Sequence, residues 1–224
     1  MMPLAIRRVL APMLVVCAVF GAPASAQGKP EDLVAAAITV LGAAIKTEEA
    51  ALAGERALPT AIGIIEQAVA PHMDFAGITR EAVGNHWARA TAAQRGDLER
   101  EFRQLLVHVL ARLLVTNKGD VLEALPTTAP PSAKQALVRV MATRQRGAGT
   151  QTLEAMQVTL RRTDSEWKVF ELRADGVDLV RLYSNNFAVV IERAGDIDGL
   201  IQALAQRNAL NAGSAAPKPR AAAQ

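Results

Sequence analysis

Apolar side chains in the first part of the chain recur with the 3.6-residue period of amphipathic helices. Residues 33–44 form one such stripe, and Asp32 stands where a helix N-cap is expected. Residues 62–69 form a second stripe, which stops before Pro71 because proline ends a helix. The pattern therefore predicts two helices in this stretch.

A longer helix is predicted from residue 92 to residue 115. Thr91 and Gln94 have the spacing of a capping box, in which each side chain bonds to the backbone N–H of the other residue. A shorter helix at residues 75–83 is preceded by Asp74 as its N-cap. The first half of the chain is thus read as helical.

After Asn117 the period changes to two, which is typical of strands with one buried face. The predicted strands are residues 121–125, 137–146, 153–162 and 167–173, and residues 179–191 and 197–205 return to helix. Helices followed by a strand meander and further helices define an α+β protein, whose sheet of about four strands we expect to be antiparallel.

The N-terminus carries the pattern of a secretion signal. Arg7 and Arg8 precede an apolar run at residues 9–21, and a small-x-small cleavage motif ends at Ala26. The run is shorter than the roughly 20 residues that span a bilayer. We therefore predict a signal peptide at residues 1–26 and export to the periplasm.

The remaining chain divides into a domain at residues 27–211 and a tail at residues 212–224 that we expect to be disordered, because it is rich in Ala and Pro and has no apolar period. The single cysteine, Cys17, lies inside the predicted signal, so the exported chain has no thiol. Without Arg7 and Arg8 the formal net charge falls from +3 to +1, which argues against nucleic acid as a partner.

Catalytic and metal-binding motifs are missing from the sequence. The histidines at positions 72, 86 and 108 have no ligand spacing, and no nucleophile elbow or phosphate-binding loop occurs. Asp196 and Asp198 are better read as capping residues of the last helix than as metal ligands. We predict no catalytic residue, no metal and no cofactor, and hence no enzyme.

Five blocks in order resemble the MlaC family, also called the toluene-tolerance auxiliary proteins. They are residues 71–78 (PHMDFAGI), 82–94 (AVGNHWARATAAQ), 101–106 (EFRQLL), 167–170 (WKVF) with 175–180 (DGVDLV), and Gly195 with 199–201 (GLI). The family's usual aromatic near Val109 is absent, and Tyr183 is followed by serine where relatives have arginine. These departures indicate a divergent branch, with the hopanoid-associated HpnM proteins as a neighbour.

The resemblance implies a lipid carrier whose sheet and helices enclose an apolar cavity. It implies a phospholipid ligand, with an inner-membrane MCE-domain ABC transporter and an outer-membrane lipoprotein–porin complex as partners. The sequence is 50% hydrophobic but only 4% aromatic, which on composition alone indicates an ordinary aliphatic core, and only the resemblance favours a cavity for flexible chains. The candidate ligand-binding residues are Phe102, Leu105, Leu106, Val109, Met156, Val158, Leu160, Val177, Val180 and Phe187.

Periodicity alone does not separate a cavity wall from an ordinary core, and three other readings stay open. In the first, the cavity holds a hopanoid or another polycyclic lipid. In the second, the protein is a hydrolase or isomerase, which requires a buried polar pair. In the third, it is an adaptor without a ligand, which requires a completely filled core.

Overall fold

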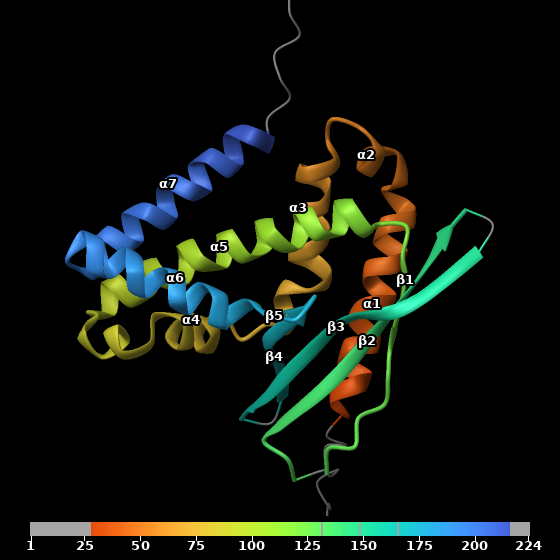
Figure 1. Ribbon diagram of the computed structural model, residues 1–224, viewed down its shortest axis with the longest axis horizontal. Helices are drawn as coiled ribbons and strands as arrows, with labels where there is room; N and C mark the ends of the chain where they lie inside the picture. Colours follow the sequence, from red (N-terminus) through yellow and green to blue (C-terminus); the bar gives the residue numbers. More distant parts are fainter. Residues whose placement is uncertain (1–27, 131, 148, 165, 216–224) are drawn as a thin grey trace, which may run out of the picture.

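The computed structural model describes residues 28–130, 132–147, 149–164 and 166–215, and it confirms the α+β class (Figure 1). Helices gather on one side and the strands form an open sheet on the other. The predicted signal peptide and residues 216–224 of the tail lie outside the described residues. Within the described part no helix is long and apolar enough to cross a membrane.

The N-terminal helices begin earlier than the sequence predicted. Helix α1 (Pro30–Thr47) starts with Pro30 in its first turn and Lys29 as N-cap, so the assignment of Asp32 as a cap was wrong. Proline suits this position because its missing N–H has no helical partner there. The following elements are α2 (Glu49–Ala53), α3 (Ala57–Ala68) and the 3₁₀ turn η1 (Ala70–His72).

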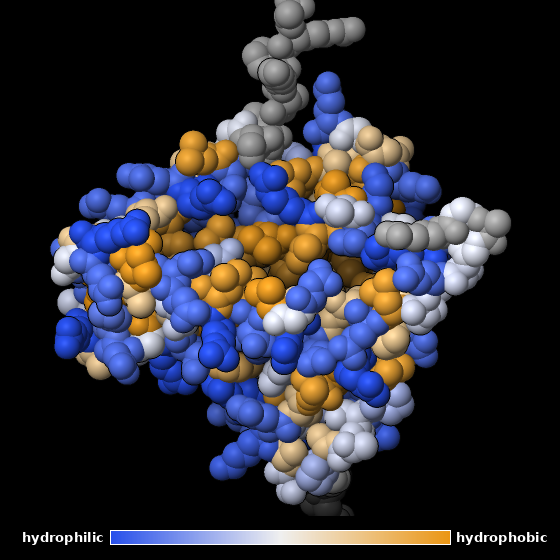
Figure 2. Space-filling model, in the orientation of Figure 1, coloured by the Kyte–Doolittle hydropathy of each residue, from blue (hydrophilic) through white to orange (hydrophobic). Residues whose placement is uncertain are grey.

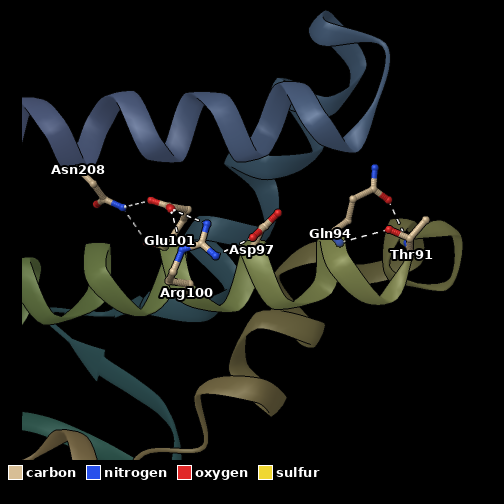
Figure 3. Close-up of polar contacts among 6 residues, drawn as sticks. All are labelled: Thr91, Gln94, Asp97, Arg100, Glu101 and Asn208. Atoms are coloured by element: carbon tan, nitrogen blue, oxygen red, sulfur yellow. Dashed lines mark hydrogen bonds and ion pairs between the residues drawn. The ribbon is translucent and has the colours of Figure 1, made fainter.

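Helix α4 (Phe75–Val83) is capped as predicted, because Asp74 Oδ1 accepts a hydrogen bond from the Gly77 N–H at 2.9 Å. A 3₁₀ segment, η2 (Gly84–Arg89), leads to the central helix α5 (Ala92–Asn117). The predicted capping box at Thr91 and Gln94 is present (Figure 3). It fixes where the longest helix starts.

Five strands form one antiparallel sheet in the order of the chain. They are β1 (Val121–Ala124), β2 (Gln135–Arg146), β3 (Gly149–Thr163), β4 (Glu166–Ala174) and the short β5 (Val177–Asp178). The sequence predicted about four strands, and β5 is the addition.

Two irregularities bend the sheet. The register of β2 against β3 shifts beside Ala155, and that of β3 against β4 shifts beside Phe170. Such bulges insert an extra residue and increase local twist. As a result Leu153, Ala155 and Met156 all face the same hollow, which strict alternation would forbid.

Helix α6 (Leu179–Ala194) follows β5, and Gly195 ends it in the left-handed conformation with φ 88°. Helix α7 (Ile197–Ala215) then packs against α5 and α6. Asp196 Oδ1 accepts from the Gly199 N–H at 2.9 Å, which confirms its predicted role as a cap. The helix continues to Ala215, so residues 212–215 of the predicted tail are helical.

The core surrounds α5 and extends from the other helices to one face of the sheet. Leu98, Phe102 and Leu106 of α5 are almost completely buried, as are Val138 and Leu160 of the sheet. Since α3, α4 and α7 also pack against α5, this helix is covered on most of its sides. Residues of α5 line two hollows of this structure.

Candidate lipid-binding site

A cavity of about 260 Å³ lies between α1, the C-terminal half of α5 and the concave face of the sheet. Its walls are mainly aliphatic. Those that come from the helices, or in the case of Val69 directly follow α3, are Leu33, Val34, Ala37, Ile38, Leu41, Ile45, Ile65, Val69, Leu110, Leu113 and Leu114. Those that come from the sheet are Leu122, Val140, Leu153, Ala155, Met156, Val158, Val169, Leu172 and Ala174.

Helix α1 supplies one wall because one of its faces is continuously apolar. Ala37 faces the cavity, whereas Ala35 is on the exposed side of the same helix. Val40, which the predicted stripe included, is 52% exposed. The helix is thus turned slightly from the orientation that its sequence suggested.

One end of the cavity is polar. Arg144 of β2 donates to Asp120 at 2.5 Å and to Asn117 at 3.4 Å. Lys118, also in the lining, donates to the backbone carbonyl of Leu52 at 2.5 Å. Arg144 Nε is buried without a hydrogen-bond partner among the described residues. The apolar interior therefore ends at two cations and at the Asp120 carboxylate that pairs with Arg144, and Arg144 retains an unused donor.

A second hollow of about 810 Å³ lies among α5, α6 and α7, and we call it the helical groove. It is more open to solvent than the cavity. Its lining is Leu105, His108, Val109, Arg112, Leu182, Tyr183, Asn186, Phe187, Val190, Leu200, Ala203, Leu204, Arg207, Leu210 and Asn211. Figure 2 shows hydrophobic side chains in a hollow that follows the course of α5, bordered by hydrophilic ones.

Three aromatic rings hold α6 against α5 beside the groove. The ring centroid of Phe102 lies 5.0 Å from that of Tyr183 and 4.9 Å from that of Phe187, both edge to face. This arrangement is favoured because the positive ring edge meets the negative face of the neighbour. It sets the spacing between the two helices.

The structure distributes the predicted ligand-binding residues over several places. Met156 and Val158 line the cavity. Leu105, Val109 and Phe187 line the helical groove. The others line neither hollow: Phe102, Leu106, Leu160 and Val180 are buried in the core, and Val177 is 49% exposed.

Sequence reasoning missed most of the cavity wall. Helix α1 was recognised as amphipathic, but nothing in its pattern distinguished a face toward a cavity from a face toward a packed core. Leu153 and Ala155 were missed because the bulge at Ala155 changes which side chains share a face.

The perturbed ionisable groups lie apart from the cavity. Burial raises the pKa of Glu171, whose Oε1 accepts from the N–H groups of Leu172 and Val180. Burial lowers the pKa of His108 and raises that of Tyr183, both in the helical groove. Within the described residues, no group of three or more His, Cys, Asp or Glu side chains is placed to hold a metal ion.

An open antiparallel sheet folded over helices, with an aliphatic cavity that ends in charged groups, defines a binding protein for an apolar or amphiphilic ligand. The family model described as MlaC protein matches residues 37–206. The chain therefore belongs to the MlaC family, as the sequence blocks indicated.

A solved structure supports the same assignment. The chain is similar to the phospholipid-binding protein from Ralstonia solanacearum, which was determined in complex with a phospholipid. The two share 25% sequence identity with a TM-score of 0.71, and the match covers 83% of this chain and 99% of that one. No curated protein matches this chain.

Proposed function

We propose that this protein is a periplasmic phospholipid carrier, which binds the acyl chains in the cavity between α1, α5 and the sheet. The observation that supports this most directly is the aliphatic cavity with Lys118 and Arg144 at one end. Membership in the MlaC family and the likeness to a phospholipid-bound protein point the same way. The role is carriage, without a chemical step.

The physical need for a carrier follows from the solubility of the ligand. Each methylene taken out of water contributes about 0.8 kcal/mol, so two acyl chains of roughly 30 methylenes together gain on the order of 20 kcal/mol when buried. A phospholipid does not leave a membrane for water at a useful rate against such a cost. An apolar pocket in a protein lowers this free-energy cost because it keeps the acyl chains out of water.

Loading requires the walls to separate. The cavity measures about 260 Å³, whereas pockets for drug-sized ligands usually measure about 300–1,000 Å³. Helix α1 is the wall most suited to move, since it packs on α3, β1 and β2 and lies away from the α5–α7 contact. A ligand that prefers the open form shifts the population toward it.

The charged end of the cavity suits a phosphate. Arg144 Nε is an unused donor beside the apolar interior, and Lys118 adds a second positive charge. A charge-assisted hydrogen bond to phosphate would hold the headgroup near solvent. It would give little selectivity for the group attached to the phosphate.

The proposed partners follow from the family. An inner-membrane MCE-domain ABC transporter and an outer-membrane lipoprotein–porin complex would exchange lipid with this protein. Each must bind the loaded and empty forms with different affinity, because otherwise binding does not shift the loading equilibrium.

Uptake of phospholipid from vesicles tests the proposal. Ala37→Trp places a large ring in the cavity, and Ala35→Trp places the same ring on the exposed face of α1. With vesicles of phosphatidylethanolamine and phosphatidylglycerol, we expect Ala35→Trp to take up lipid as the wild type does and Ala37→Trp to take up at least tenfold less. Equal uptake by two well-folded variants would exclude this cavity.

A further inference from the structure

The helical groove has no role in the proposed phospholipid site, yet its surface is that of a binding site. Leu182 is 43% exposed and Leu210 is 71% exposed, at the rim of a hollow of about 810 Å³. Contiguous exposed apolar surface of this kind marks a place of interaction.

His108 supplies the first constraint. His108 is 6% exposed and lines the groove, its ring hydrogen-bonds to the backbone of Asn211, and Nε2 has no partner among the described residues. Burial and the charge of Arg112 lower the pKa of His108, so the ring is neutral near pH 7. A neutral ring that donates through one nitrogen accepts through the other. The groove therefore offers a buried acceptor to a ligand hydroxyl.

Charge supplies the second constraint. Arg112 and Arg207 line the groove, and none of its lining residues is acidic. Arg207 is exposed and makes no hydrogen bond or ion pair with the described part of the chain. The ligand that fits this surface carries negative charge next to its hydroxyl.

Shape supplies the third constraint. The apolar floor consists of side chains one helical turn apart, Leu105 and Val109 on α5 and Leu200 and Leu204 on α7. From Leu200 to Leu210 the groove follows α7 for about 15 Å, at 1.5 Å per residue. From these two rows of side chains we infer a groove for one extended chain.

We propose that the helical groove binds a single-chain phosphate amphiphile of the lysophospholipid class. The acyl chain lies between α5 and α7, the free glycerol hydroxyl donates to His108 Nε2, and the phosphate faces Arg112 and Arg207. A fatty acid fits less well, because an ionised carboxylate has no hydrogen to donate to Nε2. This site is separate from the phospholipid cavity and is filled independently of it.

Native mass spectrometry with a defined probe tests this inference. The purified protein is first loaded with diacyl phosphatidylglycerol and then titrated with palmitoyl lysophosphatidic acid below its micelle concentration. We expect one lysophosphatidic acid to add to the loaded protein without release of the diacyl lipid. Release of one lipid for each one bound would overturn the second site, whereas failure to load the diacyl lipid would count against the carrier proposal alone.

Two matched pairs of variants locate the binding. Ala203→Trp fills the groove, and Ala205→Trp places the same ring on the exposed face of α7. Arg207→Glu reverses a lining charge, and Arg193→Glu reverses an exposed charge outside the lining. We expect at least a tenfold loss of lysophosphatidic acid affinity for Ala203→Trp, roughly a fivefold loss for Arg207→Glu, and no change for the two controls. Unchanged binding by Ala203→Trp would contradict the assignment.

The probe's own hydroxyl tests the role of His108. An analogue of lysophosphatidic acid without the free hydroxyl should bind the wild type roughly fivefold more weakly, which is the usual effect of one lost hydrogen bond. In His108→Phe this preference should disappear. Equal affinity of the wild type for the two probes would show that Nε2 does not receive the hydroxyl.

Discussion

Asn208 of α7 donates through Nδ2 to both the backbone carbonyl and the carboxylate of Glu101 on α5, each at 2.9 Å (Figure 3). Asn208 is 3% exposed and lies 107 residues from its partner. A second link joins Gln94 Nε2 to Asp198 Oδ1 at 2.8 Å. Polar contacts thus fix the position of the last helix along the central one, and that position forms one side of the helical groove.

Replacing Asn208 should therefore loosen α7. Asn208→Ala removes two hydrogen bonds, one of them to a charged group, and should cost about 2 kcal/mol in the free energy of unfolding. Urea denaturation measures it. Gln206→Ala, at an exposed position of the same helix, serves as control and should change the value by less than about 0.5 kcal/mol. A similar small loss for Asn208→Ala would mean that the contact does not anchor the helix.

The capping box at the start of α5 should also contribute measurably. Thr91→Ala leaves the Gln94 N–H without its acceptor, so we expect a loss of about 1 kcal/mol in the free energy of unfolding. Thr39→Ala is the matched control, since the Thr39 hydroxyl bonds only to the carbonyl one turn earlier in an exposed part of α1. Equal stability of the Thr91→Ala variant and the wild type would refute this role for the cap.

Glu171 predicts a pH dependence of stability. Burial raises the pKa of Glu171 above its ordinary value of 4.5, so the folded protein holds this proton more tightly than the unfolded chain. Stability that comes from the protonated group is present below pH 4.5 and is lost as the pH rises through the raised pKa.

The comparison with Glu171→Gln isolates this effect. The glutamine keeps an oxygen that can accept from Val180 N–H but has no proton to release. Denaturation at a series of pH values should show the wild type losing stability relative to the variant across this window, with a constant difference at higher pH. A wild type that gains relative stability as the pH rises would contradict the assigned direction.

Arg144 should act on both stability and phospholipid binding. Arg144→Met leaves the Asp120 carboxylate, whose side chain is 9% exposed, without its cation, and should cost about 2 kcal/mol in the free energy of unfolding. Adding Asp120→Asn removes the unpaired charge and should recover part of that loss.

The double variant then isolates the phosphate contact. In the Asp120→Asn background, Arg144→Met should lower phospholipid affinity by roughly tenfold, as expected for a lost charge-assisted hydrogen bond. Arg139→Met, on the exposed face of the same strand, should leave the affinity unchanged. If the Asp120→Asn variant binds phospholipid with the same affinity with and without Arg144→Met, the headgroup lies elsewhere.

Local signals predicted much of the fold. The caps at Asp74, Thr91 and Asp196 depend on side chains within three residues of the helix start, and all three are present. The change of period after Asn117 located the sheet, because alternation also involves only near neighbours in the chain. Such features depend on near neighbours in the chain, which the sequence displays.

Other features depend on distant partners and were not visible in the pattern. The sequence predicts an apolar stripe on α5 at Leu98, Phe102, Leu105, Leu106, Val109 and Leu113. Val107 and Ala111 lie outside this stripe and are also fully buried, because α3, α4 and α7 pack around the helix. Leu113, within the stripe, is 45% exposed. A period shows that a face is apolar, but the elements packed around it decide what that face meets.

The cavity illustrates this limit. Met156 and Val158 were predicted as ligand-binding residues and line it, whereas Phe102 and Leu160 were predicted with them and are packed in the core. Whether an aliphatic side chain borders empty space is decided by the separation of α1 from the sheet. No local pattern encodes that separation.

The lipid that this protein carries in the cell decides between a phospholipid carrier and the alternatives. Native mass spectrometry of the protein purified from the periplasm, with lipid analysis of what it releases, should show a mass addition that matches a diacyl phospholipid. A hopanoid mass would keep the cavity and replace the substrate. A bare protein that also takes no phospholipid from vesicles would contradict the carrier account.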